Sequence, residues 1–127
     1  MINLDVIKEK TEDYSRLKQL IYEGKHEEAL QLIDKLKEKG EHSPHDILLY
    51  TLLKCEILYQ QGLYTDLFKL AEQIYQESIG LGDNLLSVDA LFIMAEALIW
   101  LGETNKAEEI IKQGEELLKN QDKLSTI

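Results

Sequence analysis

The sequence is poor in residues that cross-link the chain or break helices, with one cysteine and one proline among 127 residues. Cys55 has no second cysteine to pair with, which excludes an intramolecular disulfide, and its apolar neighbours predict a buried free thiol. Proline is excluded from helix interiors, so helical structure is allowed everywhere except at Pro44. The composition therefore favours a mostly helical protein in a reducing compartment.

Long apolar runs are missing as well. No stretch reaches the length of about 18 apolar residues that predicts a membrane-spanning helix. Residues 1–5 have neither the basic start nor the apolar run of a signal peptide. From these absences we expect a cytoplasmic protein that is neither exported nor inserted in a membrane.

Basic residues are scarce relative to acidic ones: 14 Lys and Arg stand against 24 Asp and Glu, which gives a formal net charge of −10. Nucleic-acid affinity depends largely on Lys and Arg that neutralise phosphates, so a nucleic-acid partner is disfavoured. The same negative charge repels anionic membrane surfaces and favours basic or neutral partners at low salt. We therefore expect a protein or peptide partner, with no nucleic acid and no membrane.

The usual motifs of catalysis and metal binding are absent too. No strand is evident to precede a glycine-rich phosphate loop, and no nucleophile motif occurs. His42 and His45 are three residues apart, but His26 is the one other histidine and a structural zinc site generally needs four ligands. We expect no enzyme, no cofactor and no metal.

Glycine-centred turns are what the sequence does contain. In the segments 20–29, 58–67 and 97–111 an apolar helix stops at a glycine, and a second helix begins about two residues later. The turn glycines, Gly24, Gly62 and Gly102, are 38 and 40 residues apart, and periods of this size are typical of stacked helix hairpins.

This pattern predicts an all-α fold of three antiparallel helix hairpins in one domain, residues 1–127. The expected repeats cover about 4–40, 43–80 and 83–119, followed by a tail, 120–127, that we expect to fray.

The start of the third helix has the clearest signal in the chain. Ser43 is a suitable N-cap, Pro44 suits the first helical position, and Asp46 occupies the acidic position of a capping box. After the two-glycine segment 80–84, either Asp83 or Asn84 is expected to cap the fifth helix. The third and fifth helices are apolar on nearly every side, which predicts that neighbours bury them on several faces.

The hairpins resemble the tetratricopeptide repeat (TPR) family, in a variant with a long period. In that family a small residue lies five positions after the turn glycine and an apolar one follows four later. The pairs at these positions here are Ala29 with Ile33, Leu67 with Ala71, and Ala107 with Ile111. The first helix of the third repeat adds the large, apolar, small, large series Leu91, Met94, Ala95 and Leu98. The resemblance implies a right-handed α-solenoid whose concave face is lined by the first helix of each hairpin.

Alignment by the turn glycines then gives a candidate groove in which aromatic and aliphatic residues surround two glutamates. Its members are Tyr14, Lys18, Ile21, Tyr22, Leu49, Leu52, Glu56, Tyr59, Phe92, Glu96, Ile99 and Trp100. Tyr and Trp are favoured at interface hot spots, and such grooves accept helices or extended peptides. Aromatic residues at helical spacing also pack between repeats, and the sequence favours neither interpretation.

The leading functional hypothesis is a protein-interaction scaffold or adaptor that binds an apolar or basic peptide or helix in the concave groove. One alternative is a self-associating structural module, a homodimer, because no polar capping helix follows the last repeat. Another alternative is a sensor domain for a peptide or small molecule that uses the same groove.

Overall fold

The computed structural model describes the backbone of residues 12–39 and 42–125, with side chains for 15–39 and 42–120. This part of the chain is all-α, as predicted, and contains no strand. Its six helices are α1 (Glu12–Tyr22), α2 (His26–Glu38), α3 (Pro44–Gln60), α4 (Tyr64–Gly80), α5 (Asn84–Trp100) and α6 (Thr104–Ser125). None of these helices combines the length and the apolar content that crossing a membrane requires.

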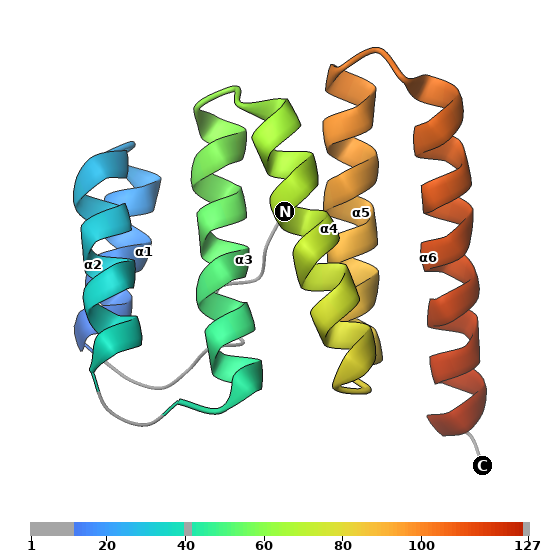
Figure 1. Cartoon of the computed structure of the whole chain (residues 1–127), viewed down its shortest axis with the longest axis horizontal. Helices are drawn as coiled ribbons and strands as arrows, with labels where there is room; N and C mark the ends of the chain where they lie inside the picture. The colour runs from blue at the N-terminus through green and yellow to red at the C-terminus, as the bar shows by residue number, and fades with distance from the viewer. Residues whose placement is uncertain (1–11, 40–41, 126–127) are drawn as a thin grey trace.

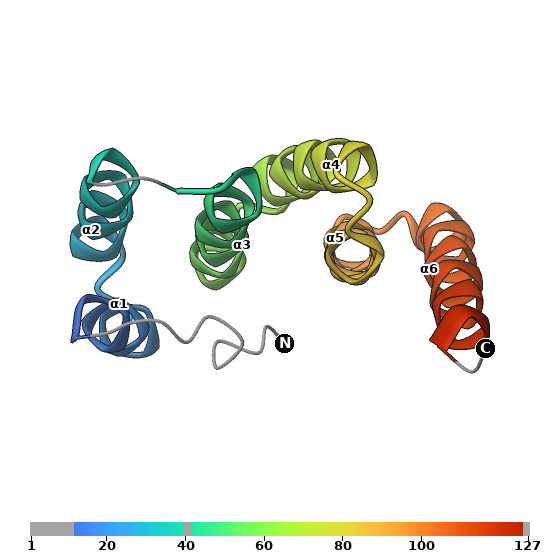
Figure 2. The ribbon, with the colours of Figure 1, turned by 90° about the horizontal axis from the view of Figure 1, so that it is seen from below.

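The helices stand side by side as a row of antiparallel hairpins, α1–α2, α3–α4 and α5–α6 (Figure 1). The turns inside the three hairpins all lie at the upper end of the row in Figure 1, and the α4–α5 turn lies at the lower end. Seen from below, α2 and α4 lie along one side of the row and α1 and α5 along the other (Figure 2). Helix α3 packs against α2 and α4, while α5 packs most extensively against α4 and α6.

One turn geometry recurs four times along the described chain. At Gly62 the backbone N–H donates to the carbonyl oxygen of Tyr59 (3.1 Å), and the N–H of Leu63 donates to that of Leu58 (3.0 Å). This pair of bonds is the Schellman motif, which needs a left-handed residue at its centre and therefore favours glycine. Equivalent bonds form at three further glycines, and all four have φ between 72° and 81°: Gly24, Gly82 and Gly102 complete the set.

The sequence predicts three of these turns, at Gly24, Gly62 and Gly102, and only a two-glycine loop in the segment 80–84. In the structure Gly82 lies 20 residues from both Gly62 and Gly102 and forms the same turn. The helices from α3 to α6 therefore follow one another through identical connections. At the end of α2, Lys39 instead has an extended backbone, with φ −94° and ψ 118°.

The helix-start signals are confirmed. The side chain of Ser43 accepts a hydrogen bond from the N–H of Asp46 (3.1 Å), while the Asp46 carboxylate accepts one from the N–H of Ser43 (3.4 Å). Pro44 is the first residue of α3. Of the two candidates for the cap of α5, it is Asp83 that accepts the hydrogen bond, from the N–H of Leu86 at 3.1 Å.

The buried core follows the repeat positions. The residues five places after the predicted turn glycines, Ala29, Leu67 and Ala107, are at most 1% exposed. Their small or branched side chains fill the contact between the two helices of each hairpin. The largest cluster joins α3, α4 and α5, a second joins α1, α2 and α3, and a third joins α5 and α6.

Helix α6 differs from the sequence prediction at its end, since it continues to Ser125 instead of stopping near Lys119. The segment 120–123 contains neither glycine nor proline, so it holds no strong helix breaker. The exposed side chains of α6 are mostly charged or polar, including Lys106, Glu109 and Glu116. The flank of the last hairpin is thus polar without an additional capping helix.

Candidate functional site

Several residues of the predicted groove lie inside the core. Ile21, Leu49 and Leu52 are 2%, 9% and 4% exposed and belong to the buried clusters. They offer almost no surface to a partner, so we leave them out of the candidate site. The side chain of Tyr14 lies outside the described residues. Lys18 is exposed on α1.

The alignment of the three repeats by their turn glycines predicts Phe92 in the groove, whereas the structure places its ring against α6. A Cβ atom built on Gly114 would lie 2.6 Å from Cε1 of the Phe92 ring. The absence of a side chain at Gly114 therefore lets the ring rest on the backbone of α6. Phe92 is 37% exposed, and its main contact is within the α5–α6 hairpin.

Two of the predicted aromatics, Tyr59 and Trp100, meet Tyr64 where the ends of α3, α4 and α5 come together. The indole of Trp100 stacks on the ring of Tyr64, with centroids 5.3 Å apart and planes inclined by 9°. Tyr64 also contacts Tyr59, at 6.3 Å and 59°. We call Tyr59, Tyr64 and Trp100 the aromatic row. Trp100 remains 57% exposed although one of its faces is covered.

Glu96 lies beside the aromatic row. It precedes Trp100 by four residues on α5, so the two side chains share one face of the helix. Hydrogen bonding to the Glu96 carboxylate, followed by burial, raises the pKa of Tyr59 above its ordinary value.

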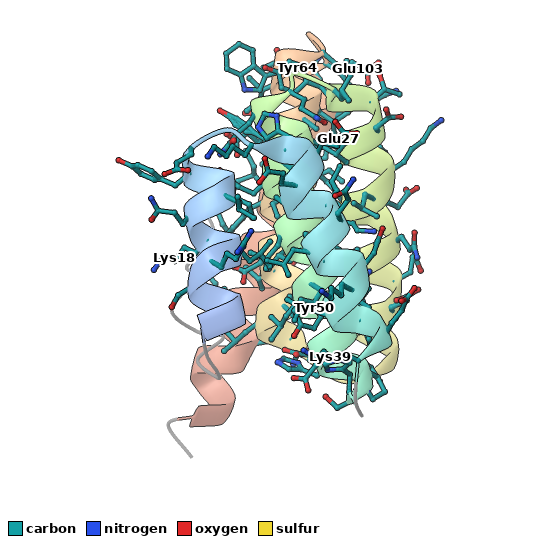
Figure 3. The ribbon with its side chains drawn as sticks, turned by 90° about the vertical axis from the view of Figure 1, so that its left-hand side faces the viewer. Lys18, Glu27, Lys39, Tyr50, Tyr64 and Glu103 are labelled. Carbon is teal, nitrogen blue, oxygen red and sulfur yellow. The ribbon has the colours of Figure 1, made fainter. Side chains whose placement is uncertain are left out.

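The sequence segments that carry the row are acidic. The segment 84–105, which includes all of α5, contains acidic residues and no basic one, and the same holds for 56–68. Among the described residues no ion pair involves Glu56 or Glu96. Oε2 of Glu56 is buried and has no hydrogen-bond partner among the described residues. Glu56 precedes Tyr59 by about one helical turn. Glu103 lies at the same end of the molecule as Tyr64 (Figure 3).

From the predicted set, the structure brings together Tyr59, Glu96 and Trp100. Glu56 lies one helical turn before Tyr59 on α3. Ile99 precedes Trp100 on α5 and is 51% exposed. Tyr22 is 86% exposed at the end of α1, and no ring contact of the described residues joins it to the aromatic row.

Sequence reasoning missed Tyr64, because only the first helix of each hairpin was searched. Its position two residues after Gly62, at the start of the second helix, was the available signal.

The opposite end of the molecule carries a second surface feature. A hollow of about 440 Å³ is lined mainly by apolar atoms of Pro44, Ile47, Leu48, Glu77, Gly80 and Leu81. The residues Ile79 and Leu85, near the α4–α5 turn, are 44% and 57% exposed.

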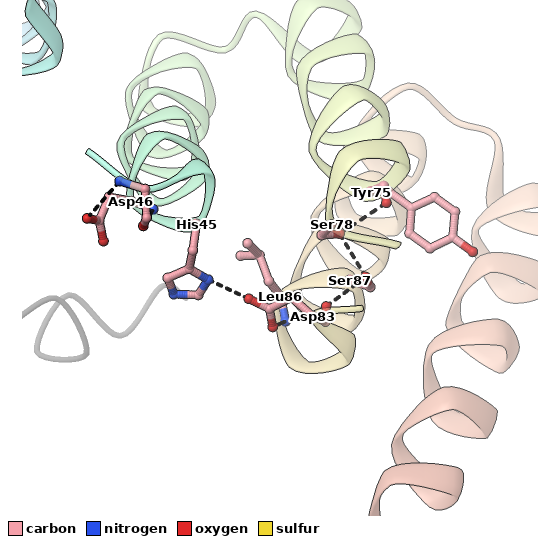
Figure 4. A network of polar contacts seen from close by, with 8 residues as sticks. His45, Asp46, Tyr75, Ser78, Asp83, Leu86 and Ser87 are labelled. Carbon is pink, nitrogen blue, oxygen red and sulfur yellow. Dashed lines mark hydrogen bonds and ion pairs between the residues drawn. The ribbon is translucent and has the colours of Figure 1, made fainter. Parts of the chain in front are cut away.

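A network of polar contacts joins α3, α4 and α5 at this end of the molecule (Figure 4). Nδ1 of His45 lies 2.6 Å from the carboxylate of Asp83, which also caps α5. The hydroxyls of Ser78 and Ser87 are 2.7 Å apart and both residues are fully buried. The network fastens the start of α3 and the end of α4 to the start of α5, which is a structural role.

The described residues contain no group of three or more His, Cys, Asp or Glu side chains placed to hold a metal ion. No family model matches the chain, and neither a curated protein nor a solved structure matches it.

Proposed function

We propose that this protein is an interaction adaptor, a stack of helix hairpins of the TPR-like solenoid type, that binds a basic and partly apolar peptide or helix. The binding surface consists of the aromatic row with Glu56, Glu96 and Ile99. The observation that carries the proposal is the state of Trp100, which stacks on the ring of Tyr64 and is nevertheless 57% exposed. A rigid, uncovered aromatic side chain loses little entropy when a partner covers it.

The charge around the row supports a basic partner. Glu56 and Glu96 have no cationic partner among the described residues, and the surrounding segments carry no basic residue. Complementary charge raises association rates and selects against acidic competitors. The alternative, in which the aromatics serve only to pack hairpins together, accounts for the stacking of Tyr64 but leaves the exposure of Trp100 without a purpose.

Selection of random dodecapeptides displayed on phage tests this proposal. The parent protein is immobilised, and peptides that also bind the Trp100→Ala variant are removed. We expect enriched peptides whose affinity falls about tenfold for Trp100→Ala, a loss typical of an interface hot spot. Circular dichroism and urea unfolding establish that the variant is folded.

Tyr22→Ala is the matched control, since Tyr22 and Trp100 both lie two residues before a turn glycine. This exposed tyrosine is outside the aromatic row, so its removal should leave peptide affinity nearly unchanged. Absence of any peptide that distinguishes the parent from Trp100→Ala would contradict the proposed function.

A self-associating module is the second candidate, and one observation favours it. Ile79, Leu81 and Leu85 expose between 44% and 57% of their surface around the α4–α5 turn, beside the apolar hollow. Light scattering over a range of concentrations tests it: a dimer that Leu85→Glu converts to a monomer supports self-association through this end. A monomer at every concentration excludes it.

A further inference from the structure

The free face of Trp100 and the Glu96 carboxylate lie close enough to act on one ligand group. Glu96 and Trp100 are four residues apart on α5, so their side chains are neighbours on one face of the helix. Residues at this spacing have Cβ atoms about 5–6 Å apart. A cation over the indole is attracted when it lies within about 6 Å of the ring centroid. One cationic group can therefore contact both side chains.

The shape of this surface distinguishes between the two common cations of proteins. The guanidinium of arginine is planar, stacks on aromatic faces and can donate hydrogen bonds from its edge at the same time. The ammonium of lysine is compact and strongly hydrated, so it cannot cover the indole face in the same way. Tyr64 occupies one face of Trp100, and no described ring covers the other.

We propose that the anchor of the bound peptide is an arginine, whose guanidinium stacks on the free face of Trp100 and donates hydrogen bonds to the Glu96 carboxylate. This inference rests on the proposed function. Glu96 also accepts the Tyr59 hydrogen bond, and a carboxylate has lone pairs enough for both donors. Glu56, on the neighbouring helix α3, adds a second negative charge and a buried oxygen that has no donor.

The experiment uses the peptides recovered from the phage selection. Each peptide is synthesised in three forms that carry arginine, lysine or citrulline at the position where arginine is enriched. Citrulline keeps the planar shape of arginine and removes its charge. Trp100 is the one tryptophan of the chain, so its intrinsic fluorescence reports binding directly. We expect affinity to fall about tenfold with citrulline and by a smaller factor with lysine.

The variant Glu96→Gln removes the charge and keeps a side chain that can accept the Tyr59 hydrogen bond. In this variant the preference for arginine over citrulline should shrink, because only the indole and Glu56 still attract the cation, and an unchanged preference would exclude the contact with Glu96. Glu72→Gln is the matched control, because Glu72 is exposed on α4 and belongs to no part of the site. It should preserve the full preference for arginine, which excludes a general effect of net charge.

The outcomes separate this inference from the proposed function. If peptides that depend on Trp100 are enriched without arginine, or bind equally well with citrulline, the arginine anchor is wrong while the interaction surface stands. A preference for lysine-rich or purely apolar peptides leads to the same conclusion. If no peptide depends on Trp100, the proposed function itself fails. Trp100→Phe keeps an aromatic face and should retain part of the preference for arginine, measured by calorimetry.

Discussion

The hydroxyl oxygens of Ser78 and Ser87 lie 2.7 Å apart at positions where the other three turns carry apolar side chains. The pair corresponds to Leu20 with Ala29, Leu58 with Leu67, and Leu98 with Ala107. Ser78 also lies 3.0 Å from the carbonyl oxygen of Tyr75, and Ser87 lies 2.9 Å from that of Asp83. The two hydroxyl groups have two protons for these three contacts, so only two hydrogen bonds form at one time. One serine donates to the other serine, and the second serine donates to its backbone carbonyl.

This proton count predicts the energetics of the pair. Ser78→Ala and Ser87→Ala should each lower the free energy of unfolding by about 1 kcal/mol, since either change removes one hydrogen bond. The remaining serine still reaches a backbone carbonyl, so no buried hydroxyl is left without a partner. The double variant should therefore lose about 2 kcal/mol in urea unfolding. A double variant as stable as either single variant would show that the count is wrong.

Gly82 and Gly80 should respond in opposite ways to the same substitution. Gly82→Ala places a Cβ at φ +72°, which should cost about 1 kcal/mol of stability or more. Gly80 is the last residue of α4, and a Cβ there meets nothing within 4 Å. Gly80→Ala should be neutral or stabilise the protein by up to about 1 kcal/mol. Urea unfolding of the two variants measures both effects, and equal changes would exclude the conformational explanation.

Local signals made most of the fold predictable. The capping box of Ser43 and Asp46 and the glycine turns act over a few residues, so the sequence contains all that determines them. The turn at Gly82 was missed because serines replace the apolar pair that marks the other three. The end of α6 was placed too early because Asn120 is only a weak helix stop signal.

The contact of Phe92 with Gly114 predicts a coupling between two helices. Gly114→Ala improves helix propensity by about 1 kcal/mol but forces the Phe92 ring away from a position 2.6 Å from the new Cβ. We expect a net loss of about 1 kcal/mol in the parent. In a Phe92→Leu background, which lacks the ring, the same change should stabilise the protein. A double-mutant cycle by thermal unfolding measures the coupling, and a coupling near zero would refute this account.

The candidate site was less predictable than the fold. Helices α3 and α5 are apolar on nearly all sides, so periodicity cannot distinguish their buried faces from an open one. For this reason the sequence predicts Leu49 and Leu52 in a groove, whereas the structure buries both side chains. The stack of Trp100 on Tyr64 joins residues from different hairpins, which only the packing of α4 against α5 brings together.

Cys55 should be almost inert toward thiol reagents in the folded protein. The side chain is fully buried in α3, and burial, followed by the charge of Glu56, raises its pKa to about 12. At about pH 8 it should therefore react with a disulfide reagent only as fast as the protein opens. A thiol introduced by Lys69→Cys at an exposed position of α4 should react at once in the same tube. Two equally fast thiols would contradict this prediction.

The same pKa shift has a consequence for stability. The folded state favours the neutral thiol, so its contribution is complete below the ordinary pKa of 9.0 and is lost as the pH rises toward about 12. Cys55→Ala should reduce the loss of stability above pH 9.0, measured by urea unfolding.

Tyr59 provides a pH-dependent signal from the candidate site itself. Its hydrogen bond to Glu96, then burial and the charge of Glu96, raise its pKa above the ordinary value of 10.0. The neutral phenol is favoured in the folded state, so this stabilisation is present below pH 10.0 and is lost as the pH rises through the raised pKa.

A phenolate beside the indole quenches its fluorescence, so the emission of Trp100 should fall with a midpoint above pH 10.0. Glu96→Gln should move this midpoint downward, because the carboxylate no longer opposes ionisation. Tyr59→Phe should remove the step. A midpoint that Glu96→Gln does not move would mean that the Tyr59 hydroxyl does not donate to Glu96 in solution.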